Sequence, residues 1–376
     1  MERKDQLPRI VWTSAFGIAF LFWSCTNRFD LAADADTGDV TGTDSDTSNV
    51  TDTDSDTGDV SGTDSDKDTN TDSDKDTESD MDTVTEESSD SDSVTETNSD
   101  STSLTFPVRG VFYYAWYPDT WTVAGEHVWY NPDLGYYSSD SSEVADKHIE
   151  FMDYAKVDVA IVSWWGQGYK HERERVLLLL NRTKAVSSDL KWTFYYEEEG
   201  RSDPSVAQIQ SDLAYLKDAY ASHDAMATIE DKPVIFVYNN GVNLDDYCEV
   251  TDRWSRANNN GEWYVVLRVF SHYAHCQDQP DAWHQYGPIS AAQDHRTSYV
   301  ISPGLWRANE SEPTLGRDHD RWYKNVRDRV ASTKPWQLIT TFNQWGDGSA
   351  VEPAGEWSSA SGYGQYLDAL HNDGVQ

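Results

Sequence analysis

The sequence has few basic side chains: 29 lysines and arginines stand against 66 aspartates and glutamates, for a net charge of -37. Residues 31–100 alone contain 24 acidic and 2 basic side chains, and so carry -22 of that charge. A protein that binds nucleic acid needs a basic surface to neutralise the phosphates. We therefore expect no nucleic-acid partner. The charge of this acidic segment does not indicate which partner the remaining chain binds.

Two common enzyme motifs are also missing. No Gly-x-Gly-x-x-Gly loop follows the first predicted strand, which disfavours a doubly wound, nucleotide-binding sheet. No Gly-x-Ser-x-Gly elbow occurs either, which disfavours an esterase.

Cysteine is scarce, at positions 25, 248 and 276. Cys248 and Cys276 form either one disulfide, in an oxidising compartment, or two unrelated buried thiols, and their spacing leaves both readings open. Long apolar runs are scarce as well. Residues 10–23 form an apolar run of about fourteen residues, too short for a confident membrane span. The run suits the hydrophobic part of a secretory signal that follows the charged residues 1–9.

The apolar run ends in Phe22-Trp-Ser-Cys25, which resembles the lipobox of bacterial lipoproteins. The resemblance implies a signal peptide at residues 1–24, cleavage before Cys25 and lipid attachment to Cys25. Several acyl chains give a durable anchor, since each buried methylene contributes about 0.8 kcal/mol. The alternatives are a plain signal peptide and an uncleaved anchor. All three export the protein, and the lipid places it on the bacterial outer membrane or cell surface.

Residues 25–103 are predicted to be a disordered tether. From about Leu31 onward they are mostly Asp, Ser, Thr and Gly, and Thr-Asp-Ser-Asp recurs from Thr43, Thr53 and Thr63. Such a segment has too little apolar surface to offset its chain entropy, and its charges repel one another. A calcium-binding repeat is the alternative, because aspartates supply oxygen ligands, but the glycines do not recur at fixed loop positions.

Residues 104–376 have an ordinary composition and the length of one (β/α)8 TIM barrel. Strand-like runs occur at residues 108–116, 157–164, 191–197, 233–238, 263–270, 298–302 and 336–342, with a weak eighth at 283–286. Helical periodicity occurs between them at residues 142–156, 172–186, 206–220, 245–257 and 318–331. This alternation predicts parallel βαβ units and a barrel, with an open doubly wound sheet as the alternative.

Polar and aromatic residues gather where these strands end, at the face where barrel enzymes place their chemistry. Indole and phenol rings stack on the C–H faces of sugars, while polar groups bind hydroxyls. An oligo- or polysaccharide is therefore the expected partner, and core filling is the alternative for any single ring. The candidate substrate-binding residues are Tyr114, Trp116, Glu126, His127, Trp164, Trp165, Glu197, Asn343 and Trp345. We expect no metal or other cofactor, because His272 and His275 are better explained as solvated or sugar-contacting side chains.

The loop at residues 341–354 reads Thr-Phe-Asn-Gln-Trp-Gly-Asp-Gly-Ser-Ala-Val-Glu-Pro-Ala. Together with Ser163-Trp-Trp-Gly166 and the order of the other strand-end motifs, it resembles glycoside hydrolase family 99. This is the family of endo-α-mannosidases and endo-α-mannanases. The resemblance implies a barrel that cleaves within α-mannosides without a metal, using two carboxylates three residues apart. By position, the base falls on Gln344 and the acid/base on Asp347.

Gln344 departs from the family pattern, because an amide donates and accepts hydrogen bonds but is no base. Three interpretations follow. Another carboxylate supplies the base, with Glu197, Glu198 and Glu352 as candidates. Alternatively, Asp347 serves as the acid in a different glycosidic reaction, or the barrel binds glycans without cutting them.

Overall fold

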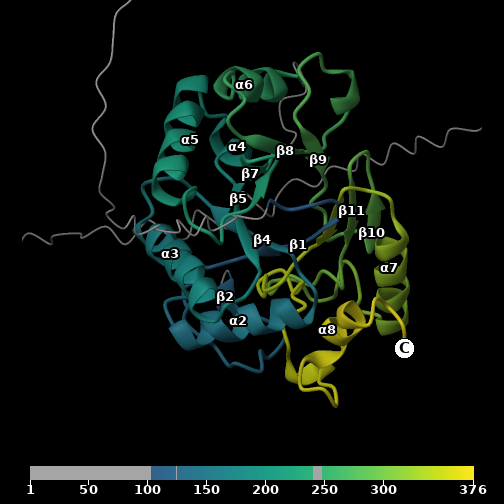
Figure 1. Ribbon diagram of the computed structural model, residues 1–376. Helices are drawn as coiled ribbons and strands as arrows, with labels where there is room; N and C mark the ends of the chain where they lie inside the picture. Colours follow the sequence, from purple (N-terminus) through teal and green to yellow (C-terminus); the bar gives the residue numbers. More distant parts are fainter. Residues whose placement is uncertain (1–102, 124, 240–247) are drawn as a thin grey trace, which may run out of the picture. The chain divides into compact units, whose positions relative to one another are not determined.

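The computed structural model describes residues 103–123, 125–239 and 248–376 (Figure 1). The predicted signal peptide, Cys25 and nearly all of the predicted tether lie outside the described residues. In the described ranges, no helix is both long and apolar enough to cross a membrane.

Eight parallel strands form the centre of the fold, in the spatial order β11, β12, β1, β4, β5, β7, β8, β9. Their bounds are β1 (Val108–Tyr113), β4 (Val159–Trp164), β5 (Lys191–Tyr196), β7 (Lys232–Val237), β8 (Tyr264–Arg268), β9 (Ala282–His284), β11 (Ser298–Ile301) and β12 (Trp336–Ile339). Each overlaps a run predicted from the sequence, the weak eighth run included. The predicted (β/α)8 TIM barrel is confirmed.

The barrel closes between β9 and β11 through a side chain. Thr297 Oγ1 accepts the Trp283 N–H at 2.6 Å and donates to the Trp283 carbonyl at the same distance. Short strands outside the ring escaped prediction: β6 (Thr228–Ile229) pairs with β7, β10 (Ala292–Asp294) with β11, and β2 (Thr122–Val123) with β3 (Glu126–His127). Runs of two or three residues carry too little periodicity to be recognised.

Helices surround the strands in Figure 1, and the five predicted ones are present. They are α2 (Ser142–Tyr154), α3 (Lys170–Ala185), α5 (Val206–Tyr220), α6 (Glu249–Ala257) and α7 (His319–Ala331). Side-chain caps begin three of them: Ser141 accepts the Val144 N–H, Ser205 that of Gln208 and Asp318 that of Arg321. The structure adds α8 (Gly364–His371), the short α4 (Glu199–Ser202), and the single turns η1 (Tyr273–His275) and η2 (Gly355–Trp357).

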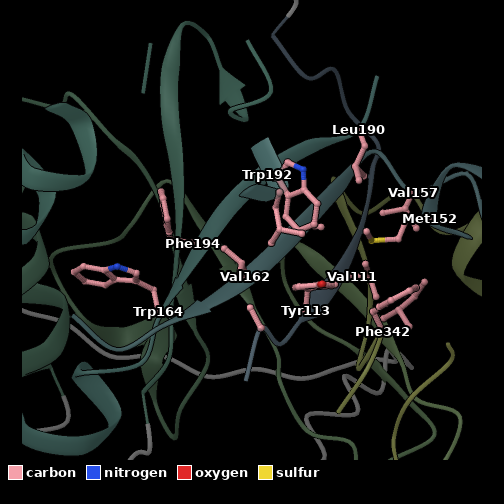
Figure 2. Close-up of a cluster of buried hydrophobic side chains, with 14 of the residues drawn as sticks. Val111, Tyr113, Met152, Val157, Val162, Trp164, Leu190, Trp192, Phe194 and Phe342 are labelled. Carbon is pink, nitrogen blue, oxygen red and sulfur yellow. The ribbon is translucent and has the colours of Figure 1, made fainter. Parts of the chain in front are cut away.

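The core has two layers, because successive strand residues point to opposite faces. Inside the barrel, Phe112 packs on Tyr195 with ring centroids 4.8 Å apart, and Phe236 packs on Trp336 at 4.9 Å. His284 is fully buried beside these rings, and burial lowers its pKa to about 3, so it is neutral. Outside the barrel, the neighbours of these residues join a buried cluster that includes Met152 of α2 and Leu179 of α3, and Tyr113, Val162 and Trp192 of this cluster are drawn in Figure 2.

Cys248 and Cys276 form a disulfide, which decides between the two readings left open by their spacing. Cys248 directly precedes α6, and Cys276 directly follows η1. The bond therefore links the connection after β7 to the connection after β8, on the side of the barrel where the strands end.

Candidate active site

Side chains at the ends of β1, β4, β5 and β9, or one or two residues beyond them, meet at the carboxyl end of the barrel. The Ser163 hydroxyl donates to Glu197 Oε1 at 2.9 Å, and Trp165 Nε1–H donates to Ser163 Oγ at 3.1 Å. The Tyr114 hydroxyl donates to the Tyr286 hydroxyl at 2.7 Å. We call Tyr114, Ser163, Trp165, Glu197 and Tyr286 the mouth cluster.

Glu197 is the buried carboxyl of the mouth cluster, with 2% of its surface exposed. Burial raises the pKa of Glu197 to about 8, although the Ser163 hydrogen bond and the charge of Arg268 act in the opposite direction. The carboxyl is therefore mostly protonated at neutral pH and able to donate a hydrogen bond.

Arg268, at the end of β8, is held beside this cluster. Its Nη1 donates to the Asn239 carbonyl at 2.6 Å, its Nε donates to Gln285 Oε1 at 3.2 Å, and its guanidinium lies 5.1 Å from the Tyr238 ring centroid. Ser163, Arg268 and Tyr286 are not among the site residues predicted from the sequence. They could have been identified from the sequence, because each lies at an inward-facing position at the end of a predicted strand.

Trp116 extends the mouth cluster and forms an aromatic wall with Tyr114 and Trp165. The Tyr114 and Trp116 rings lie 4.6 Å apart, and the Trp116 and Trp165 rings 6.3 Å apart. Trp164 points the other way, into the outer core, where its ring lies 5.5 Å from Tyr196 and close to Phe194 (Figure 2). Strand alternation separates the two neighbouring indoles, so only Trp165 joins the site.

Asn343 and Trp345 hold the loop at residues 341–354, which we call the closing loop, in place. Asn343 Oδ1 accepts the Tyr114 N–H at 2.8 Å, and its Nδ2 donates to the Tyr114 carbonyl at 2.9 Å. Trp345 is fully buried and donates from Nε1 to Glu352 at 3.0 Å. The structure shows their hydrogen bonds within the protein, and their contact with substrate stays a prediction.

Glu352 is the centre of a buried network behind the closing loop. It has no exposed surface and accepts hydrogen bonds from Tyr137 at 2.8 Å and Trp345 at 3.0 Å, with His148 Nε2 at 3.2 Å. His148 Nδ1 lies 2.9 Å from the Tyr113 hydroxyl. These contacts give Glu352 the position of an anchor for the loop.

Asp347 is the partly exposed carboxyl of the closing loop, with 20% of its side chain exposed. Burial raises the pKa of Asp347 above its ordinary value, while Arg307, whose Nε lies 3.8 Å from Oδ1, acts in the opposite direction. Gln344 precedes it on the same loop and is 8% exposed. Its backbone N–H donates to Thr341 Oγ1 at 2.9 Å, and its carbonyl accepts the Ser349 N–H at 3.2 Å.

The remaining predicted residues, Glu126 and His127, form β3 and are exposed. The His127 ring stacks on Tyr136 with centroids 5.8 Å apart. In the described part of the chain, no group of three or more His, Cys, Asp or Glu side chains is arranged to hold a metal ion.

The sequence model of glycosyl hydrolase family 99 matches residues 124–262. The glycoprotein endo-alpha-1,2-mannosidase-like protein of Danio rerio is 24% identical over 270 residues, which covers 60% of this chain and 59% of that protein. The glycoprotein endo-alpha-1,2-mannosidase of Rattus norvegicus is 21% identical over 286 residues, covering 59% and 56%. The chain thus spans less than two thirds of the length of these relatives.

Solved structures with the same fold cover more of the barrel. The family 99 endo-alpha-mannosidase from Bacteroides thetaiotaomicron is 21% identical, with a TM-score of 0.52 over 71% of this chain and 95% of that one. A glycoside hydrolase-like protein is 14% identical, with a TM-score of 0.53 over 73% and 96%. These likenesses show a shared fold.

Proposed function

We propose, from the premise that this chain has a fold like that of glycosyl hydrolase family 99, that it hydrolyses α-linked mannosides within an oligo- or polysaccharide. The names of the relatives support this substrate class. The mouth cluster supports it chemically, because its aromatic wall suits sugar rings and its hydroxyl and carboxyl groups suit sugar hydroxyls.

Asp347 is the proposed acid, and it carries the proposal. An acid must hold a proton for the leaving oxygen, so it needs a raised pKa and an open position. Asp347 has both, since burial raises its pKa while 20% of its side chain remains exposed. It also occupies the position of the family's acid/base in the closing motif.

Glu197 is the proposed substitute for the missing base. Glu352 is engaged by Tyr137, His148 and Trp345, and Glu198 pairs with Arg201 at 3.6 Å and accepts a hydrogen bond from Ser202. Glu197 belongs to the mouth cluster, and a pKa of about 8 is close enough to neutrality for proton transfer in either direction. Gln344 then contributes hydrogen bonds to a sugar hydroxyl, but no proton transfer.

A glycan-binding protein without catalytic activity is the second candidate. Gln344 favours it, because the amide removes one of the two catalytic carboxylates of the family. In that case the protonated Glu197 serves as a hydrogen-bond donor to sugar hydroxyls.

Product release from a panel of α-mannans and α-glucans by the full chain tests both candidates. For the hydrolase, we expect wild-type cleavage that Asp347→Asn and Glu197→Gln abolish. Binding without product after long incubation would refute it. Cleavage by Gln344→Glu alone would identify a binding protein with an enzyme's framework.

We also propose export and lipid anchoring at Cys25, on the bacterial outer membrane or cell surface. The apolar run, the lipobox-like ending and the Cys248–Cys276 disulfide support this, since disulfides persist in oxidising compartments. Intact mass of the membrane-extracted protein should show an acylated amino terminus at residue 25. An unmodified mature chain would refute the anchor.

A further inference from the structure

Trp129 presents a large aromatic surface to solvent, with 40% of its surface exposed. Its ring stacks on the half-buried Trp306, with centroids 4.3 Å apart and planes at 21°. Its Nε1–H donates to the Arg307 carbonyl at 2.8 Å. Two contacts therefore fix the orientation of an indole whose other face remains open.

The support of this indole is joined to the loop that carries Asp347. The Trp306 N–H donates to the Asp347 carbonyl at 2.8 Å, and the Ala308 N–H donates to the Gly346 carbonyl at 3.0 Å. Gly348 makes this approach possible: a Cβ there would lie 2.5 Å from the Trp306 oxygen, and its φ is +60°. Residues 306–308 thus lie directly against the loop, with Arg307 3.8 Å from the Asp347 carboxylate.

We propose that Trp129, backed by Trp306, is a stacking platform for a sugar ring on the leaving-group side of the bond next to Asp347. A rigid, exposed indole offers the flat apolar surface on which the C–H face of a sugar packs. The acid protonates the oxygen that leaves, so a surface fixed beside the acid is in reach of the leaving part of the glycan. This proposal rests on the proposed hydrolase function and implies a substrate that continues past the cleaved bond.

Two measurements on Trp129→Ala test the platform. The first compares kcat/KM for oligosaccharides prepared from α-mannan with kcat/KM for an aryl α-mannoside, which has no leaving-side sugar. Loss of one stacking contact should lower kcat/KM for the oligosaccharides, relative to kcat/KM for the aryl α-mannoside, by about tenfold. Trp129→Phe should restore most of the ratio, because it keeps an aromatic face.

The second measurement is calorimetric binding of the same oligosaccharides to Asp347→Asn, with and without Trp129→Ala. We expect the protein that also carries Trp129→Ala to bind the oligosaccharides about tenfold more weakly. Phe106→Ala is the matched control, since Phe106 is 43% exposed and precedes β1 at the opposite end of the barrel.

The outcomes separate this proposal from the hydrolase function. Weaker binding by Trp129→Ala in a protein that hydrolyses none of the substrates would refute the hydrolase, and with it the leaving-group side of the proposal, and would retain Trp129 only as a sugar-stacking surface. An unchanged ratio together with unchanged affinity would overturn the platform while leaving the hydrolase intact. An equal loss with Phe106→Ala would also overturn it, because the effect would then be one of stability.

Discussion

Glu197 is a carboxyl group whose proton the barrel retains at neutral pH, since burial raises its pKa from 4.5 to about 8. Between these values the folded state binds this proton more tightly than the unfolded chain does. The free energy of unfolding therefore falls as pH rises through this window, by about 3 kcal/mol between pH 4.5 and pH 7 for this group alone.

Glu197→Gln should remove this dependence. We expect the free energy of unfolding of the variant minus that of the wild type to grow by about 3 kcal/mol from pH 4.5 to pH 7, since Gln does not titrate. Urea unfolding at several pH values measures it. If the free energy of unfolding changed with pH in the same way for both proteins, burial would not raise the pKa of Glu197.

Arg307 adjusts the acid of the closing loop. Its positive charge, 3.8 Å from Asp347 Oδ1, lowers the pKa of a carboxyl that burial raises. Arg307→Gln should raise the pKa of Asp347 further, because Glu310 then acts on it without compensation. The protonated acid would persist to higher pH. The fall of kcat/KM on the alkaline side of its pH profile should therefore begin at a higher pH.

Arg182→Gln is the control for this shift, since Arg182 pairs with Asp146 between α3 and α2. If Arg307→Gln left the alkaline side of the kcat/KM profile unchanged, a group other than Asp347 would supply the proton.

At the scale of elements, the closing loop after β12 is held by two sets of contacts. Asn343 fastens it to the end of β1 through both amide atoms, and Glu352 fastens it to α2 and to the preceding loop through His148 and Tyr137. The position of Asp347 therefore depends on Asn343, a predicted substrate-binding residue, and on Glu352, a predicted substitute for the base.

Glu352→Ala should act on stability. It removes the buried carboxylate that accepts from Tyr137 and Trp345 and lies against His148 Nε2, which should lower the free energy of unfolding by about 3 kcal/mol. Equilibrium urea unfolding measures this, and Glu356→Ala is the control because its bonds to Asn131 are exposed. Loss of hydrolysis at unchanged stability would instead support Glu352 as the substitute base.

At the scale of the whole barrel, the Cys248–Cys276 disulfide closes a chain segment with a sequence separation of 28. Loss of the bond frees the unfolded chain, so Cys248→Ser with Cys276→Ser should lower the free energy of unfolding by about 3.5 kcal/mol. Unfolding with and without a reductant measures the effect. An equal response of wild type and variant to the reductant would show that the bond does not form.

Much of the barrel is predictable because its signals are local. Runs such as 191–197 and 336–342 have the apolar, β-branched and aromatic character of buried strands, and the helices between them show a clear period with caps at Ser141 and Ser205. The short strands β6 and β10 have no such signal. They exist because longer strands offer them an edge to pair with.

The sequence by itself determined the alternation of strands and helices, the closing motif with Gln344 and Asp347, and the separation of an acidic amino-terminal segment from the barrel. Only the tertiary structure decided that Trp165 joins the mouth cluster while Trp164 enters the core. It also decided that Glu352 is buried behind the closing loop and Glu197 in the mouth cluster, and that Trp129 stacks on Trp306, whose N–H donates to the Asp347 carbonyl. The physical reason is that hydrophobic periodicity is a property of neighbouring residues. Burial, pKa and disulfide pairing depend on groups brought together from strands and loops far apart in the chain.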